Sequence, residues 1–347
     1  MIETGNLPPE VERERALFEL SPEERQEMEH SWGAMEEFIQ RLERVSSPEV
    51  MDTVTRFEHE DDETTKQKAM KLYEFGNKFF DPIDNMDPMS YEIGIRLGLA
   101  DNTVVLDENG EIISGLQSQL IEMDPKIGSN LKEALFNVWY VGTDPNYHGR
   151  PVTREIFVKA LRASLEKAKA GLLKVKGITG ETDPDVERIF NRYDLKRAYI
   201  KDRKGRFAEV PYEAAPEDES EGGSPQHFMM KMFDGGYELT TEELSKITSN
   251  MHAQYYRDEF LSQDYLEWAR NWYNNLAEDP DDVKDDEVTD KRAASYKRKY
   301  TAKVQKLDSK FDDAIGKSVD GKVILMSERE RRARVGQGET VVDWKDE

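Results

Sequence analysis

Apolar residues recur at alternating spacings of four and three over residues 28–42, which is the pattern of an amphipathic helix. The positions are Met28, Trp32, Met35, Ile39 and Leu42. The stretch follows Ser21-Pro22-Glu23-Glu24, where a serine N-cap and a glutamate three residues on make a capping box, and proline suits the first helical turn. We expect a helix with one apolar seam, which packs on this chain's own core or on a helix of another subunit.

Three further stretches are predicted to be helical. Thr153 is placed to cap an amphipathic helix that extends to Ala170. Thr240 and Glu243 form a second capping box before another apolar run. Residues 130–140 are also expected to be a helix, because apolar residues again recur at helical spacing, at Leu131, Leu135, Val138 and Trp139.

Turn residues between short β-branched runs predict two hairpins. Asn109-Gly110 separates the runs 103–106 and 111–113, and this dipeptide is the strongest short hairpin signal. A second hairpin is expected over 197–212, around the turn 202–205. The predicted fold class is therefore mainly α (α+β), with helical domains, a few short β-hairpins and polar linkers.

Polar stretches divide the chain into segments. Residues 213–226 have almost no apolar side chain and are typical of a flexible acidic linker. The predicted organisation is a charged N-terminal arm (1–20), a main helical region with both hairpins (21–212), the linker (213–226), a smaller aromatic-rich helical region (227–277), an acidic linker (278–290), a basic amphipathic helix (291–317) and a C-terminal tail with a short strand (318–347).

The 347 residues carry a net charge of −23 and include no cysteine. Without cysteine, disulfides, thiolate metal sites and cysteine nucleophiles are excluded. The acidity repels nucleic acid and anionic membrane at long range. The amino terminus lacks the basic and apolar segments of a signal peptide, and no stretch has the roughly 18 apolar residues of a membrane span. We expect a cytoplasmic protein, or a component of a particle assembled in the cytoplasm.

Charge is segregated in the C-terminal third, where the acidic stretch 278–290 is followed by the basic stretch 291–310. Three interpretations stay open. The basic stretch is a solvated helix, or it pairs with acidic stretches of other subunits, or it contacts phosphate groups within a complex.

Fragments that resemble catalytic or ligand motifs lack a required residue or context. Gly316-Lys317-Ser318 ends like a phosphate-binding P-loop, but Phe311 stands where the first glycine belongs. Glu27-x-x-His30 has the spacing of a di-iron helix, but no second copy occurs. His148, in a turn-rich loop, is the histidine best placed for acid–base chemistry. We predict no catalytic residue, no cofactor and no metal, although 72 acidic residues leave an unassigned carboxylate pair open.

These patterns favour a non-enzymatic structural or assembly protein of a multi-subunit complex, and a virion or scaffold is one such setting. The alternatives are an acidic regulatory protein with a basic or nucleic-acid-binding partner, and an enzyme with carboxylate chemistry on an unrecognised fold. The expected partners are other protein subunits, in a homo-oligomer or larger assembly, with nucleic acid bound only through 291–310 and no membrane. The candidate interaction residues are Trp32, Met35, Ile39, Trp268, Trp272, Lys297, Arg298, Lys299 and Lys303.

Overall fold

The computed structural model describes most of the chain, with gaps. The described residues are 17–46, 53–78, 88–98, 100–123, 128–147, 152–182, 187–214, 224–233, 235–236, 238–252 and 305–343. None of the helices in these ranges is long and apolar enough to cross a membrane.

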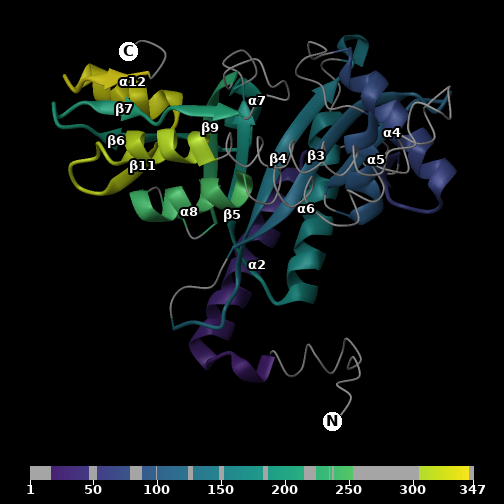
Figure 1. Ribbon diagram of the computed structural model, residues 1–347, viewed down its shortest axis with the longest axis horizontal. Coiled ribbons are helices and arrows are strands. Elements are labelled where there is room, and N and C mark those ends of the chain that lie inside the picture. Colours follow the sequence, from purple (N-terminus) through teal and green to yellow (C-terminus); the bar gives the residue numbers. More distant parts are fainter. Residues whose placement is uncertain are drawn as a thin grey trace, which may run out of the picture.

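A 12-stranded mixed sheet forms the centre of the protein (Figure 1). Its main path runs in the order β1-β2-β3-β4-β5-β9-β6-β11-β10, with β12 and β7 paired beside β6, and β8 paired with β9. Neighbours on this path are antiparallel except for β4 and β5. The strands are β1 Val54–Phe57, β2 Asp101–Leu106, β3 Ile112–Met123, β4 Glu133–Thr143, β5 Lys174–Thr182, β6 Lys196–Lys201, β7 Phe207–Glu209, β8 Tyr212–Ala214, β9 Ser224–Met232, β10 Glu238–Thr240, β11 Lys322–Met326 and β12 Val341–Val342.

Helices cover both faces of the sheet. One face, called here the α4 face, buries apolar residues of α4, α5, α8 and a helix over 305–315. The other, called the α6 face, buries residues of α2, α6 and α7. The short α12 lies over β7 and β11 at the other end of the molecule from α4 (Figure 1). The labelled helices are α2 Pro22–Glu43, α4 Asp62–Gly76, α5 Pro88–Leu97, the 3-10 turn η1 Pro145–Tyr147, α6 Val152–Gly171, α7 Glu187–Arg192, α8 Thr241–His252 and α12 Glu328–Gly336.

The fold class predicted from the sequence is wrong, because a large sheet and not a set of helical domains organises the chain. Strands from both sides of the predicted linker 213–226 enter that one sheet. β9 lies between β5 and β6, and β11 pairs with β6. The two predicted hairpin turns do lie between paired strands, β2–β3 and β6–β7.

The helix predicted over residues 130–140 is also wrong, because Glu133–Thr143 form β4. Leu135 and Trp139 lie in the core of the α4 face, while Phe136 and Val138 lie in the core of the α6 face. A strand that is apolar on both faces shows no alternation along the sequence. The spacing of Leu131, Leu135 and Val138 therefore matches that of a helix, although most of this segment is a strand.

The helix predicted to begin near Ser21 is confirmed as α2, with both hydrogen bonds of the capping box. Its apolar seam faces inward, because Met35 and Ile39 are fully buried against α6 and β5 of the same chain. The indole Nε1 of Trp32 donates a hydrogen bond to the carbonyl oxygen of Leu173 at 2.8 Å. This bond ties α2 to the end of α6, just before β5 begins.

We expect Gly177→Ala to destabilise the protein strongly, because a Cβ there would lie 2.0 Å from the backbone oxygen of Lys231 on β9. Overpacking costs about 1–3 kcal/mol and occasionally more, and a backbone atom cannot move aside as a flexible side chain can. Gly33→Ala, in the middle of α2, meets nothing within 4 Å and is expected to stabilise by about 0.5–1 kcal/mol. Urea unfolding of both variants measures the difference. Equal midpoints would contradict the close approach of β5 and β9.

Candidate functional site

The parallel pair β4 and β5 is the best candidate for positioning a ligand. The chain leaves β4 at its carboxyl end, passes through η1 and α6, and returns as β5. In open α/β sheets, ligands bind outside the carboxyl ends of such parallel strands. The carboxyl ends of β4 and β5 are therefore the candidate ligand site.

These two strands separate before they end. Their ladder runs from Glu133 opposite Lys174 to Val138 opposite Gly180. Beyond Val138, β4 continues to Thr143 in register with β3, and no residue of β5 is in register with Val141 or Gly142. Figure 1 shows the two strands together at their amino ends and apart toward their carboxyl ends. The last part of β4 is thus paired on its β3 side and diverges from β5 on the other.

A bulge in β4 marks the point of separation. Val138 is opposite Ser118 and Tyr140 is opposite Gln117, so Trp139 is the extra residue. Its indole Nε1 donates to the side-chain oxygen of Gln119 at 3.3 Å. Bulges bend a strand and redirect its side chains, and they are common next to active sites.

The first turn of α6 lies beside the end of β4. The hydroxyl groups of Thr143 on β4 and Thr153 on α6 are 2.8 Å apart. The first four amides of a helix have no partner within it and carry partial positive charge, which favours anions. Residues 148–151, which join η1 to α6, lie outside the described residues.

An aromatic cluster supports the α6 face beneath the divergence. Tyr193 stacks on Phe157 of α6 with 4.3 Å between ring centroids, and Phe157 meets Phe136 of β4 edge-on at 5.9 Å. Burial raises the pKa of Tyr193 to about 12. Its phenol therefore stays protonated and uncharged at neutral pH.

On the opposite, α4 face, a buried polar pair spans the two strands. The Thr179 hydroxyl on β5 donates to the side-chain oxygen of Asn137 on β4 at 2.7 Å, and both residues are fully buried. These residues face each other one step before the ladder ends. The pair thus sets polar groups at the base of the divergence.

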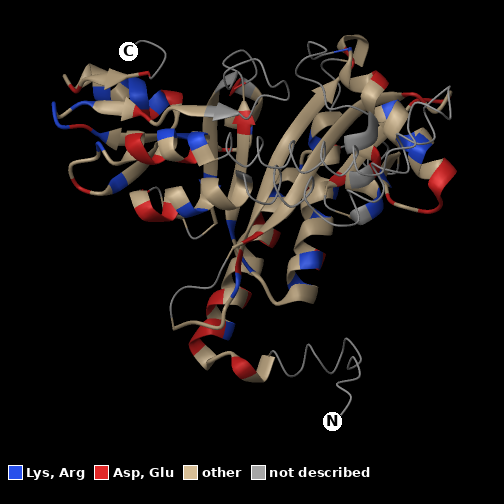
Figure 2. Ribbon diagram, viewed as in Figure 1, with Lys and Arg blue, Asp and Glu red and all other residues tan. Residues whose placement is uncertain are grey.

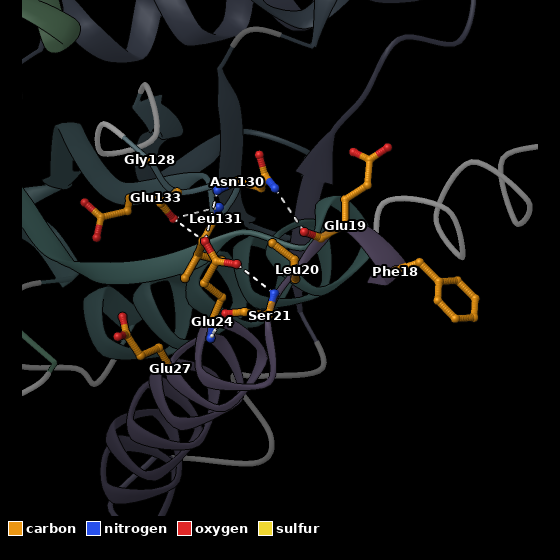
Figure 3. A pocket seen from close by; sticks show the side chains of 11 residues that line it. Phe18, Glu19, Leu20, Ser21, Glu24, Glu27, Gly128, Asn130, Leu131 and Glu133 are labelled. Atoms are coloured by element: carbon orange, nitrogen blue, oxygen red, sulfur yellow. Dashed lines mark hydrogen bonds between the residues drawn. The ribbon is translucent and has the colours of Figure 1, made fainter.

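A pocket of about 660 Å³ lies at the other end of β4, where α2 begins (Figure 3). Its carboxylates already have partners. Glu24 accepts hydrogen bonds from the Ser129 hydroxyl at 2.5 Å and from the Asn130 amide at 3.0 Å. Glu27 pairs with Lys174 at 2.7 Å, and no group of acidic or histidine residues among the described residues could hold a metal ion. The hydrogen bonds of Glu24 join α2 to the segment before β4, and they are called here the clasp.

Only three of the interaction candidates named from the sequence lie among the described residues. Trp32, Met35 and Ile39 pack within the chain on the α6 face, so whether they also contact a partner stays a prediction. His148 lies outside the described residues, as do the remaining interaction candidates, Trp268, Trp272, Lys297, Arg298, Lys299 and Lys303.

Sequence reasoning missed the residues that shape the divergence. Asn137 lies in the stretch that the sequence pattern predicts to be a helix and that forms β4. The run from Phe136 to Val141, rich in aromatic and β-branched residues, was the signal that could have identified β4 as a strand. Thr153 was recognised, but only as a helix cap.

No protein-family model and no curated protein sequence matches the chain. Several solved structures resemble part of it. Arabidopsis thaliana NAA60 in complex with acetyl-CoA is 10% identical, covers 52% of this chain and 98% of its own, and has a TM-score of 0.35. An aminoglycoside acetyltransferase from an uncultured soil metagenomic sample is 17% identical, with 41% and 84% covered and a TM-score of 0.32. A Desulfovibrio desulfuricans protein named for the GNAT family of acetyltransferases is 10% identical, with 52% and 99% covered and a TM-score of 0.33.

The predicted function, a non-enzymatic structural or assembly protein, is corrected by these findings. The prediction relied on helical domains with a seam open to other subunits, whereas the chain folds around a large sheet with Met35 and Ile39 buried inside it. Two of the three solved structures named above are described as acetyltransferases, which are enzymes, and the third is a complex with acetyl-CoA.

We expect the clasp at Glu24 to make stability depend on acid pH. Hydrogen bonds, first from the Ser129 hydroxyl and then from the Ser21 amide, lower the pKa of Glu24 from 4.5 to about 2. A carboxylate with a lowered folded-state pKa stabilises above its unfolded pKa, and this contribution is lost as pH falls toward the folded value. Glu24→Gln should therefore melt below wild type at neutral pH, and the difference should shrink between pH 4.5 and 2.

Thermal melts of both proteins across that pH range measure this effect. Glu23→Gln, one residue away in the exposed part of the same helical turn, is the matched control and should follow wild type. A gap between wild type and Glu24→Gln that stays constant down to pH 2 would show that the carboxylate charge plays no part.

Proposed function

We propose that this chain is an acyltransferase that takes its acyl group from a coenzyme A thioester. The observation that carries the proposal is the divergence of β4 from β5 after Val138 and Gly180. It brings a strand edge, a bulge and the start of α6 to one place, at the carboxyl ends of two parallel strands.

Acetyl-CoA, the ligand of one matched structure, has the chemistry that this place could receive. Its arm is long, thin and carries amide groups, so it can lie along a strand that lacks a neighbour in register. Its pyrophosphate is suited to the amides at the start of a helix, here α6.

In such a reaction, an amine or hydroxyl group attacks the thioester carbonyl. The carbon–sulfur bond then breaks, and the leaving thiolate takes up the proton that the nucleophile loses. Backbone amides near the bulge at Trp139 would stabilise the charge that forms on the carbonyl oxygen. The proposal includes a cytoplasmic location, where acyl-CoA is made and used. Protein partners stay a prediction.

Titration calorimetry of the full chain with acetyl-CoA tests the proposal. We expect Thr153→Asp to weaken binding by about tenfold, because it adds a negative charge to the first turn of α6 where the pyrophosphate would lie. An acidic residue in a first helical turn is otherwise favourable, so the fold should be unaffected.

Thr241→Asp is the matched control, since it makes the same change in the first turn of α8. It should bind acetyl-CoA as wild type does. Release of free thiol from acetyl-CoA, in the presence of a mixture of amines, then measures transfer. If wild type binds no acetyl-CoA, or if all three proteins bind it equally, the proposed site is wrong.

A further inference from the structure

Helix α12 lacks an apolar face. None of its residues Glu328–Gly336 is buried, and charged side chains lie along most of the helix (Figure 2). Its one large apolar residue, Val335, is 52% exposed. A helix on the surface of a folded protein usually packs an apolar stripe onto the core, so α12 must be held in place by other contacts. Residues 327–343, which include α12 and β12, are called the strap below.

The surface that the strap covers is apolar. Tyr199 on β6, Phe207 on β7 and Met326 on β11 form a small cluster there, and each is exposed by 6% or less. The guanidinium of Arg334 on α12 lies 4.5 Å from the centre of the Phe207 ring. The strap itself adds one apolar side chain to the cluster, Val341 of β12, which is only half-buried. A cluster with buried aromatic rings is thus covered by a segment that is mostly polar.

Charged groups join the strap to the sheet. Lys196 Nζ on β6 lies 3.0 Å from the Glu330 carboxylate of α12. The carboxylate of Asp343, just after β12, lies 3.7 Å from Arg197 on β6 and 3.1 Å from Arg331 on α12. The side chains of Glu330 and Asp343 are 45% and 25% exposed, so dissolved ions can reach both carboxylates. Ion pairs that solvent reaches are weak, and salt screens them further.

The backbone contact between the strap and the sheet is short. β12 pairs with β7 over only two residues, and the Phe207 amide donates a hydrogen bond to the carbonyl oxygen of Thr340 at 2.9 Å. α12 begins with a capping box of Ser327 and Glu330, which stabilises its first turn from within. An isolated helix of this length is still unstable in water. α12 is therefore expected to unfold once it leaves the sheet.

We propose that the strap is held by charge and opens as one unit while the rest of the sheet stays folded. Asp343 joins the end of β12 to α12 through Arg331, so the two parts of the strap leave together. Opening uncovers the apolar cluster and the edge of β7 that β12 occupies. Ionic strength thereby controls access to an apolar surface at this end of the sheet. The proposal is independent of the acyltransferase function.

α8 provides an internal comparison. It also begins with a capping box, formed by Thr240 and Glu243. Unlike α12, it buries an apolar face in the core through Leu244, Ile247 and Met251. Screening of charges leaves such apolar contacts in place. α8 is therefore expected to keep its protection from hydrogen exchange at a salt concentration that opens the strap.

Hydrogen exchange of the full chain in about 0.1 M and about 1 M potassium chloride tests the proposal, because the screening length falls from about 10 Å to about 3 Å. We expect the amides of α12 and of Phe207 to exchange about fivefold faster at the higher salt, and those of α8 to change little. Met326 should also be oxidised faster by dilute hydrogen peroxide, because its thioether becomes accessible. Met28, which is 1% exposed on α2, is the reference and should not be.

Lys196→Met removes the cation that pairs with Glu330 and keeps an apolar stem of similar length. It should speed exchange of α12 at the lower salt and leave a smaller further rise at the higher salt. Lys201→Met is the matched control, since it makes the same change on the same strand. Within the described part of the chain, Lys201 forms no ion pair with the strap. Asp343→Asn is the second variant, should Lys196→Met fail to fold.

Three results would overturn the proposal. If α12 exchanges equally fast in both salts, or if Lys196→Met behaves as Lys201→Met does, charge does not hold the strap. If α12 exchanges only together with β4 and β5, the strap opens only when the whole protein unfolds. If α12 exchanges faster at high salt while the oxidation of Met326 is unchanged, the helix frays in place and the cluster stays covered.

Discussion

The parallel ladder between β4 and β5 joins two halves of the sheet, and all other strands are arranged on either side of it. On one side, β1 to β4 form an antiparallel run, and on the other, β5 pairs with β9 and through it with the strands beyond. Phe190 of α7 contributes to the end of this ladder. Its ring packs where a side chain of Gly180 would stand, since a Cβ there would lie 2.6 Å from the ring. The last step of the ladder thus depends on a glycine that admits an aromatic ring.

Local signals predict the helices better than the sheet. The capping box at Ser21 and the amphipathic run after Thr153 are encoded by residues close in sequence, so α2 and α6 could be predicted to within one or two residues. β4 could not, because it is buried on both faces and so lacks the alternation that reveals a strand. The pairing of β11 with β6 joins residues more than 120 positions apart, and no local pattern specifies such a register.

The candidate site could not be predicted from the sequence, for a related reason. It contains no motif, because its features are a separation of strands, a bulge at Trp139 and the buried pair of Asn137 and Thr179. These two are ordinary polar residues 42 positions apart until the register of β4 and β5 places them opposite each other. Sequence reasoning looked for charged and nucleophilic side chains, which the centre of β3 and β4 does not have.

The net charge of −23 sets a condition on the donor that the proposed site would take. An anionic acyl donor would approach this chain against long-range repulsion, which salt screens beyond about 8–10 Å. Its binding would therefore depend on short-range contacts, such as those with the amides at the start of α6 and with the part of β4 that continues after the ladder with β5 ends at Val138 and Gly180.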